Sequence, residues 1–176
     1  MNVRLLVLVL LSSFAVLSQE SMTIDKIGSF PATPVWNFIC DNYVLNDHVS
    51  IQIAKTEKGG FLKIEVETTK NTFTIAGNLY VDLEDFSAII CKDKRLRAVS
   101  GNRIVSYYSF TAAEMKRLQK LNITGIRFCI KGKSDKFSSQ SGYFTAVNKI
   151  KFFRTTFDFK PKVHETAQEV LKLYVN

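Results

Sequence analysis

The chain has 176 residues, of which 46% are hydrophobic and 23% charged, and only 3 are proline. This composition excludes a disordered polymer, and the length suits one globular domain. The net charge of +8 is unevenly distributed: residues 19–91 carry 5 Lys and Arg against 10 Asp and Glu, whereas residues 92–176 carry 18 against 6. The second half is therefore suited to an anionic partner, unless the two halves interleave in one sheet and neutralise each other.

The N-terminus has the pattern of a secretory signal peptide. Arg4 precedes an apolar run over residues 5–11, and Val16 and Ser18 are small enough for the positions before the cleavage site. We expect residues 1–18 to be removed and the mature chain to be secreted or periplasmic; the alternative is an anchor that is not cleaved. No later stretch approaches the roughly 20 apolar residues of a membrane span, so we expect no transmembrane segment after cleavage.

Residues 19–34 lack a regular apolar pattern and contain the breakers Gly28, Pro31 and Pro34. We expect this stretch to be a lead-in segment. A single α+β domain is expected to follow over residues 35–176.

Apolar residues then alternate with polar ones in four segments, a period of two that is typical of strands with one wet face. Lys58, Gly59 and Gly60 supply a turn between the second and third segments, which predicts an antiparallel hairpin. Gly77 interrupts the fourth segment and indicates a bulge or a close contact. The apolar residues are, in order, Trp36, Phe38 and Cys40; Val49, Ile51 and Ile53; Leu62, Ile64 and Val66; and Phe73, Ile75, Leu79 and Val81.

A short apolar run at residues 88–91 and a hairpin with its turn at residues 100–102 come next. They lead into a strand, a helix and a strand over residues 103–131. The helix is long enough for a short crossover, so the two strands of this unit could pair in parallel.

The helix of that unit is predicted over residues 111–121. Thr111 and Glu114 have the spacing of a capping box, in which each side chain binds the backbone N–H of the other residue. Asn122 suits the left-handed residue that ends a helix.

The remaining chain is predicted to contain an exposed polar loop at residues 132–142, one or two strands at residues 143–153, and a final helix over residues 163–175. The apolar stripe of this helix should close the core, and it consists of Val163, Ala167, Val170, Leu171 and Tyr174. The predicted class is α+β: a mostly antiparallel twisted sheet of about six to nine strands with the two helices 111–121 and 163–175.

Three cysteines, Cys40, Cys91 and Cys129, occur in the chain. Export permits one disulfide between two of the three cysteines, and the third would remain a free thiol. Three pairings are possible, and the sequence does not rank them. The alternative is three buried thiols. Alternation places Cys129 on the more polar face of its strand.

No catalytic or cofactor motif is complete. His164 begins a match to the zinc motif H-E-x-x-H, but Gln168 stands where the second histidine is needed. Residues 132–134 resemble the end of a phosphate-binding loop, but Arg127 stands where a glycine must let the backbone wrap the phosphates. We expect no catalytic residue, no metal, no nucleotide and no other cofactor.

A small secreted hydrolase is the first alternative to a binding protein. Asp47 and His48 would supply an acid–histidine pair for a nucleophile such as Cys91 or Cys129, and His164 is the other candidate base.

Two further patterns have ordinary explanations. The acidic residues Asp82, Glu84 and Asp85 lack the spacing of a calcium loop and are typical of a solvated turn. Asn122 and Thr124 fit a glycosylation acceptor, which has meaning only in a eukaryotic secretory pathway.

Basic residues are the most numerous candidate site residues, and some are interleaved with aromatic ones, as in sites for anionic chains. The predicted ligand-binding residues are Lys92, Lys94, Arg95, Arg97, Lys131, Lys133, Lys136, Lys149, Lys151 and Arg154. The sequence therefore favours a non-enzymatic binding domain with a basic face for a glycan, a lipid headgroup or a similar anionic partner. A structural or assembly subunit that pairs through an edge strand is the second alternative.

Overall fold

The computed structural model describes residues 20–40, 48–69, 72–132, 140–151 and 162–175. Twelve strands and two helices lie in these ranges. The strands are β1 (Ser21–Ile24), β2 (Gly28–Pro31), β3 (Trp36–Cys40), β4 (His48–Thr56), β5 (Gly59–Glu67), β6 (Thr74–Ile75), β7 (Leu79–Leu83), β8 (Ala88–Cys91), β9 (Leu96–Ser100), β10 (Arg103–Thr111), β11 (Ile123–Lys131) and β12 (Gly142–Val147). The helices are α2 (Ala112–Leu118) and α3 (Thr166–Lys172).

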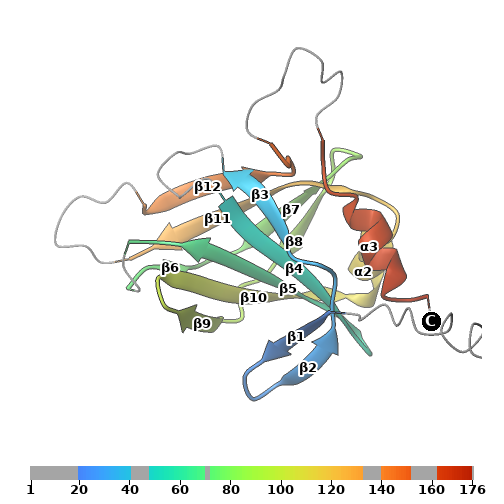
Figure 1. The fold of residues 1–176 in the computed structure, drawn as a ribbon, viewed down its shortest axis with the longest axis horizontal. Coiled ribbons are helices and arrows are strands. Elements are labelled where there is room, and N and C mark those ends of the chain that lie inside the picture. The colour runs from blue at the N-terminus through green and yellow to red at the C-terminus, as the bar shows by residue number, and fades with distance from the viewer. Residues whose placement is uncertain (1–19, 41–47, 70–71, 133–139, 152–161, 176) are drawn as a thin grey trace, which may run out of the picture.

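Ten of the strands form one curled antiparallel sheet (Figure 1). Their order is β8-β7-β11-β12-β3-β4-β5-β10-β9, and β6 pairs with β11 beside this path. The first and last strands of this order, β8 and β9, are joined by only four residues, so the sheet has to curl until its two edges approach each other. The predicted α+β class is confirmed, and the sheet has one strand more than the upper estimate of nine.

The two strands of the strand–helix–strand unit, β10 and β11, do not pair with each other. β10 lies between β5 and β9, whereas β11 pairs with β12, β7 and β6, and all these pairings are antiparallel. Because both edges of each strand are already occupied, α2 connects two strands that are not neighbours.

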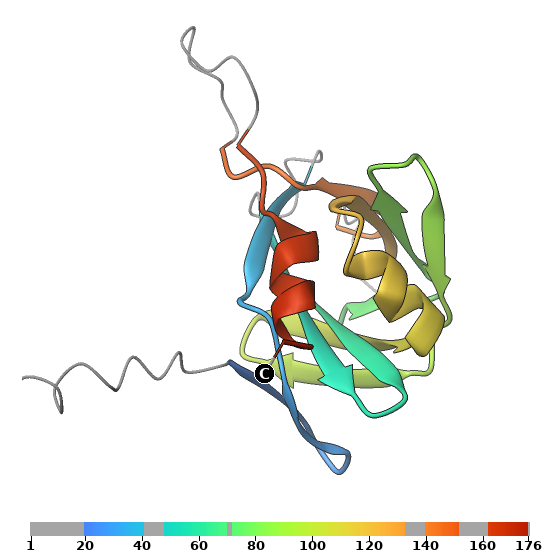
Figure 2. The same ribbon diagram turned by 90° about the vertical axis from the view of Figure 1, so that its right-hand side faces the viewer.

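The core fills the inside of the curl. The predicted inward residues of β4 and β5, among them Ile51, Ile53, Leu62 and Ile64, are completely buried. The predicted wet face is confirmed for β5 and wrong for β4, whose other face is also buried at Ser50, Gln52 and Ala54. Figure 2 shows the two helices side by side over one open end of the curled sheet, and α2 contacts both α3 and β5. The helices therefore close the end of a core that the strands alone would leave open to water.

The predicted capping box starts α2. The N–H of Glu114 donates to Thr111 Oγ1 at 3.2 Å, and the N–H of Thr111 donates to Glu114 Oε2 at 2.6 Å. The helix ends at Leu118, three residues before the predicted boundary. Asn122 is not left-handed, and its side chain binds α3 instead: Oδ1 accepts the N–H of Ala167 at 3.0 Å.

The final helix is shorter than predicted, and its buried side differs. Val170 and Leu173 are buried together with Ala167, but Leu171 is 44% exposed and Tyr174 is 37% exposed. The segment before Thr166 is not helical, so the predicted stripe from 163 to 174 is wrong at its two ends and at Leu171. The cause is a contact from outside the segment: Asn148 binds the N–H and the carbonyl of His164 at 2.8 and 2.9 Å.

The segment expected only as a lead-in forms the β1–β2 hairpin. Met22 and Ile24 of β1 are buried in a second, smaller apolar cluster, together with Ala32 and Ala54. Phe61 packs against this cluster from the outer face of β5. The hairpin therefore covers part of the outer face of the sheet, and the alternation of Met22 and Ile24 with polar neighbours was the signal for it.

Candidate anion-binding site at the seam of the sheet

The connection between β8 and β9 crosses the seam where the two edges of the curled sheet approach each other, and Asp93 organises it. Its carboxylate accepts the N–H of Gly77 at 2.9 Å, the N–H of Arg95 at 2.7 Å and the guanidinium of Arg97 at 2.5 Å. Burial alone would raise the pKa of Asp93, but these hydrogen bonds from Arg95, Gly77 and Arg97 outweigh it and lower the pKa. The carboxylate therefore stays ionised and fixes the turn.

Strand β6 lies under this turn and is held by buried polar groups. The carbonyl of Ile75 accepts Arg97 Nε at 3.0 Å and the hydroxyl of Ser106 at 3.1 Å. The hydroxyl of Tyr108 donates to the carbonyl of Gly77 at 3.1 Å. Ser106 and Tyr108 are buried, and burial raises the pKa of the Tyr108 phenol, so both hydroxyls remain neutral donors. The backbone around the seam is therefore rigidly positioned.

Four exposed cations lie on the two segments that contact β6 and the residues directly after it. Lys92, Lys94 and Arg95 belong to the turn on one side, and Lys131 lies on the other side, where its backbone pairs with Thr74. We call Lys92, Lys94, Arg95 and Lys131 the seam cluster. None of the four has an acidic partner among the described residues. They are thus available for an external anion.

The backbone of Arg95 is left-handed, with φ of 59°. A residue with a Cβ costs free energy in this conformation, and glycine or asparagine is the usual occupant. The hydrogen bond from its N–H to Asp93 holds it there. Lys26 and Phe86 adopt the same conformation in other turns, so the backbone of Arg95 shows the shape of the turn and not a function.

Not all of the predicted basic residues meet at the seam. Arg97 lies there but is neutralised by Asp93. Lys149 and Lys151 are exposed in the segment after β12, not on a strand as alternation had suggested, because β12 ends at Val147. Lys133, Lys136 and Arg154 lie outside the described residues.

The residues after β12 are far from the seam cluster. Asn148, next to Lys149, binds the carbonyls of Ile123 and Thr124 at the start of β11, whereas Lys131 is at its end. Eight residue steps along a strand span about 26 Å. That separation exceeds twice the Debye length of about 10 Å at 0.1 M salt, so the two basic regions act independently.

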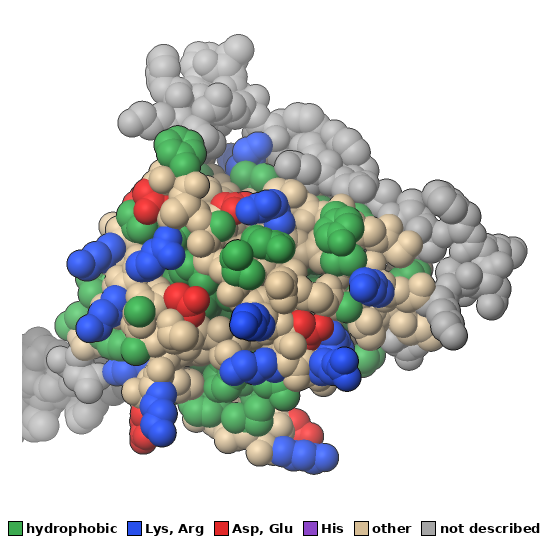
Figure 3. All heavy atoms as spheres, turned by 180° about the vertical axis from the view of Figure 1, so that it is seen from behind, with side chains coloured by type: hydrophobic (Ala, Val, Ile, Leu, Met, Phe, Trp, Pro, Cys, Tyr) green, Lys and Arg blue, Asp and Glu red, His purple; other side chains and the backbone are tan. Residues whose placement is uncertain are grey.

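The basic surface is not one continuous face. On the side of the molecule that Figure 3 shows, basic side chains are interspersed with acidic and apolar ones. Arg103 and Lys63 both bind Glu65, at 2.7 and 2.8 Å, and Arg127 binds Asp82 at 2.8 Å. Part of the positive charge is therefore neutralised within the sheet. The seam cluster is one group of unpaired cations in the described ranges, and Lys149, Lys151 and Lys162 form another.

The two histidines occupy structural or exposed positions. His164 stacks on Phe38, with ring centroids 6.1 Å apart, and its Nε2 is 3.4 Å from the carbonyl of Asn37. It precedes α3, so the partial zinc motif does not lie on one helix. His48 is exposed at the start of β4, opposite Ile39, and Asp47 lies outside the described residues.

The acidic residues after β7 are each engaged. Asp82 holds Arg127, Glu84 accepts the amide of Asn122 at 3.3 Å, and Asp85 accepts the N–H of Ser87 at 3.0 Å. No three metal-ligating side chains gather anywhere in the described part of the chain. The same amide nitrogen of Asn122 contacts Glu165 at 3.3 Å, so a glycan attached there would displace two contacts.

No disulfide joins the three cysteines, all of which are buried in the described ranges. Cys129 is 8% exposed although it alternates with Arg127 and Lys131. Burial, with a smaller contribution from the charge of Glu114, raises the pKa of the Cys91 thiol to about 12. That thiol is therefore a core residue, unsuited to nucleophilic attack at neutral pH.

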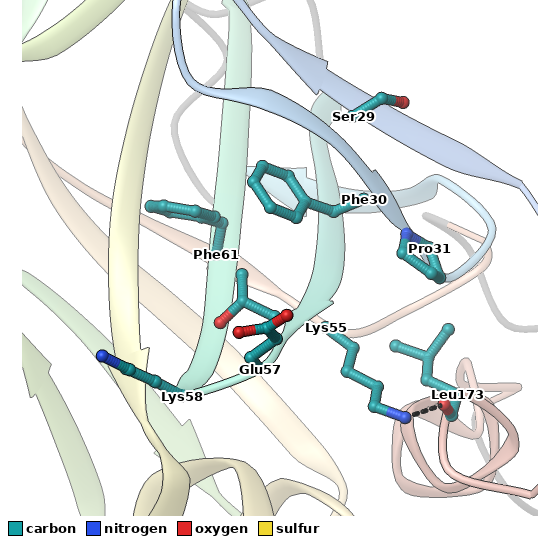
Figure 4. A pocket seen from close by; sticks show the side chains of 9 residues that line it. Ser29, Phe30, Pro31, Lys55, Glu57, Lys58, Phe61 and Leu173 are labelled. Carbon is teal, nitrogen blue, oxygen red and sulfur yellow. Dashed lines mark hydrogen bonds between the residues drawn. The ribbon is translucent and has the colours of Figure 1, made fainter.

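An open hollow of about 740 Å³ lies between β2, the turn after β4, and the end of α3 (Figure 4). Phe30 and Phe61 point toward one another across it, with ring centroids 5.5 Å apart. The amine of Lys55 donates to the carbonyl of Leu173 at 3.1 Å and is therefore used by the protein itself. Lys58 and Glu57 add opposite charges, so this hollow has no anion preference.

Sequence reasoning missed Asp93, the residue that shapes the site. The sequence did contain a signal for this turn, because an aspartate often accepts the N–H of the residue two positions later in the chain and so forms a turn. Its contact with Gly77, sixteen residues away in the sequence, depends on the curl of the sheet and could not be read from the sequence.

Comparison of the chain with protein-family models, with curated proteins and with solved structures found no match. Among the helices in the described ranges, none has the length and apolar character needed to span a bilayer. The site geometry alone supports the proposal below.

Proposed function

We propose that this chain is an exported, non-enzymatic binding protein that uses the seam cluster to bind an anionic partner. The observation that carries this proposal is the arrangement of the four exposed cations on the two segments that contact β6 and the residues directly after it. The polar groups beneath them are already satisfied by one another, and the cations have no acidic partner among the described residues. An acidic glycan, an anionic lipid headgroup and an acidic protein segment all offer the required negative charge.

Two features support the non-enzymatic part of the proposal. His164 is engaged by Phe38 and the backbone of Asn37, and the Cys91 thiol is protonated in the core. A general base needs a reacting group within hydrogen-bond reach, and neither residue faces one in the described ranges.

Export is part of the proposal and rests on the pattern of residues 1–18. Intact-mass measurement of the chain produced in a secreting host should show a mature protein that begins at residue 19. A full-length product retained in the cytosol would contradict export and the extracellular partners that follow from it.

The binding proposal is tested by titrating the wild-type protein with a heparin fragment over a series of salt concentrations. Binding through the seam cluster displaces counterions from the anion, so the affinity should fall steeply as salt rises. Single alanine substitutions at Lys92, Lys94 and Lys131 should each weaken it in small, similar steps. Absence of binding at low salt, or binding that salt does not affect, would contradict the proposal.

A further inference from the structure

Strand β9 is the last strand in the order of the sheet. It pairs with β10, and none of the described segments pairs with its other side. The two-residue turn at Gly101 and Asn102 joins β9 to β10, with Ser100 opposite Arg103. The closing pair of such a hairpin exchanges both hydrogen bonds, and alternate residues then direct their N–H and C=O groups outward.

By this alternation the outward backbone groups of β9 are those of Val99 and Arg97. No backbone hydrogen bond from another described segment reaches either residue. The side chain of Val99 is 54% exposed. Residues 96–100 contain no proline, and their register with β10 contains no bulge, so the edge has a regular geometry that an added strand can match.

Charge decides which strand fits this edge. The unpaired cations Lys92, Lys94 and Arg95 lie in the turn before β9, whereas Arg97 is paired with Asp93 and Arg103 with Glu65. A second copy of the chain would offer β9 only like charge along its own edge. An acidic segment instead brings carboxylates to the seam cluster while its backbone pairs with β9.

We propose that β9 accepts an extended acidic segment of another protein as an additional strand. The main-chain groups of Arg97 and Val99 supply the strand pairing, and Lys92, Lys94 and Arg95 select for acidic side chains. The inference rests on the proposed function, because the same seam cluster provides the charge. It adds that the partner is a protein segment and that its backbone is recognised.

The test compares three probes with the wild-type protein at one salt concentration: a blocked seven-residue peptide alternating Glu with Thr and Val, its backbone N-methylated analogue, and a heparin fragment. The unmodified peptide should bind, with chemical-shift changes at the amides of Arg97 and Val99. N-methylation on the pairing edge should weaken binding by about tenfold or more, because main-chain hydrogen bonds are lost at unchanged charge.

Two variants at the edge provide the matched control. Val99→Pro removes one outward N–H, whereas Val99→Thr keeps it and changes the side chain by a similar amount. Val99→Pro should bind the peptide about tenfold more weakly than Val99→Thr, and both should bind heparin like the wild type. If Val99→Pro does not fold, the N-methylated peptide on the wild-type protein decides the question.

The results distinguish a failure of strand addition from a failure of the proposed anion-binding function. Equal binding of the two peptides, or heparin binding without peptide binding, would overturn strand addition and leave the anion site intact. Binding of none of the three probes would overturn the proposed function as well. Peptide binding that is equally strong in Val99→Pro and Val99→Thr, with Val99→Pro folded, would show that the basic residues at this edge recognise charge alone, which also overturns strand addition.

Discussion

The guanidinium of Arg97 lies 2.5 Å from the carboxylate of Asp93, and the same carboxylate oxygen accepts the N–H of Gly77 at 2.9 Å. This one side chain joins the turn after β8, the start of β9 and the segment after β6. Asp93→Asn keeps the shape but removes the charge, and we expect it to lower the free energy of unfolding at pH 7 by about 1–3 kcal/mol, measured by urea denaturation.

The stability that Asp93→Asn removes should depend on pH, because the pKa of Asp93 is lowered in the folded protein. A carboxyl group whose pKa is lower in the folded state contributes stability above its unfolded pKa of about 3.9, and that contribution disappears as pH falls through the folded value. The difference between wild type and Asp93→Asn should therefore narrow below about pH 4. A difference that stays constant from pH 7 to pH 2 would show that the charge of Asp93 is not responsible.

A substitution at Arg95 should affect anion binding and stability differently. Asparagine tolerates the left-handed backbone better than arginine, so Arg95→Asn should leave stability unchanged or raise it by up to about 1 kcal/mol. The same change removes one cation of the seam cluster and should weaken heparin binding. Thermal unfolding and a heparin titration on the same sample check both parts, and a variant that loses stability without losing affinity would assign Arg95 a purely structural role.

Two neighbouring residues of α3 should respond very differently to truncation. Val170 is fully buried, so Val170→Ala should cost about 1–3 kcal/mol through lost burial and a cavity. Leu171→Ala removes an exposed side chain and should cost below about 0.5 kcal/mol. Chemical denaturation of both variants checks this, and a larger loss for Leu171→Ala would mean that the helix is rotated about its axis.

Asn148 connects the C-terminal segment to β11. It is buried, its amide donates to the carbonyls of Ile123 and His164, and its oxygen accepts the N–H of His164. Asn148→Ala should cost about 1–3 kcal/mol because one buried and two partly buried backbone groups lose their partner. Hydrogen exchange should accelerate first around α3; uniform acceleration throughout the sheet would contradict this local role.

Local patterns were sufficient where one segment decides its own structure. The alternation along β5 was predictable because this strand has one buried face, and the capping box of Thr111 and Glu114 fixes the start of α2 by itself. The start of α3 was not predictable, because Asn148 holds the residues before it. The short β1–β2 hairpin was missed because its four-residue strands are bounded by Gly28 and Pro31.

The candidate site depended on information that no single stretch contains. The basic residues were evident in the sequence, but their grouping follows from the curl that brings β8, β6 and β9 together. That curl places Lys92 and Lys131 on segments that both contact the region of β6, and Lys149 lies near the opposite end of β11. Arg97 differs from its exposed neighbours because it is paired with Asp93, four residues before it.

The most direct test of the central claim compares two triple alanine variants on one heparin column with a salt gradient. One variant removes Lys92, Lys94 and Arg95 from the seam cluster, and the other removes the exposed residues Lys149, Lys151 and Lys162 near the opposite end of β11. Both lose three positive charges. The account predicts that the first variant elutes at clearly lower salt than the wild type while the second elutes close to it. Equal shifts for the two variants, or a larger shift for the second, would contradict an anion-binding site at the seam.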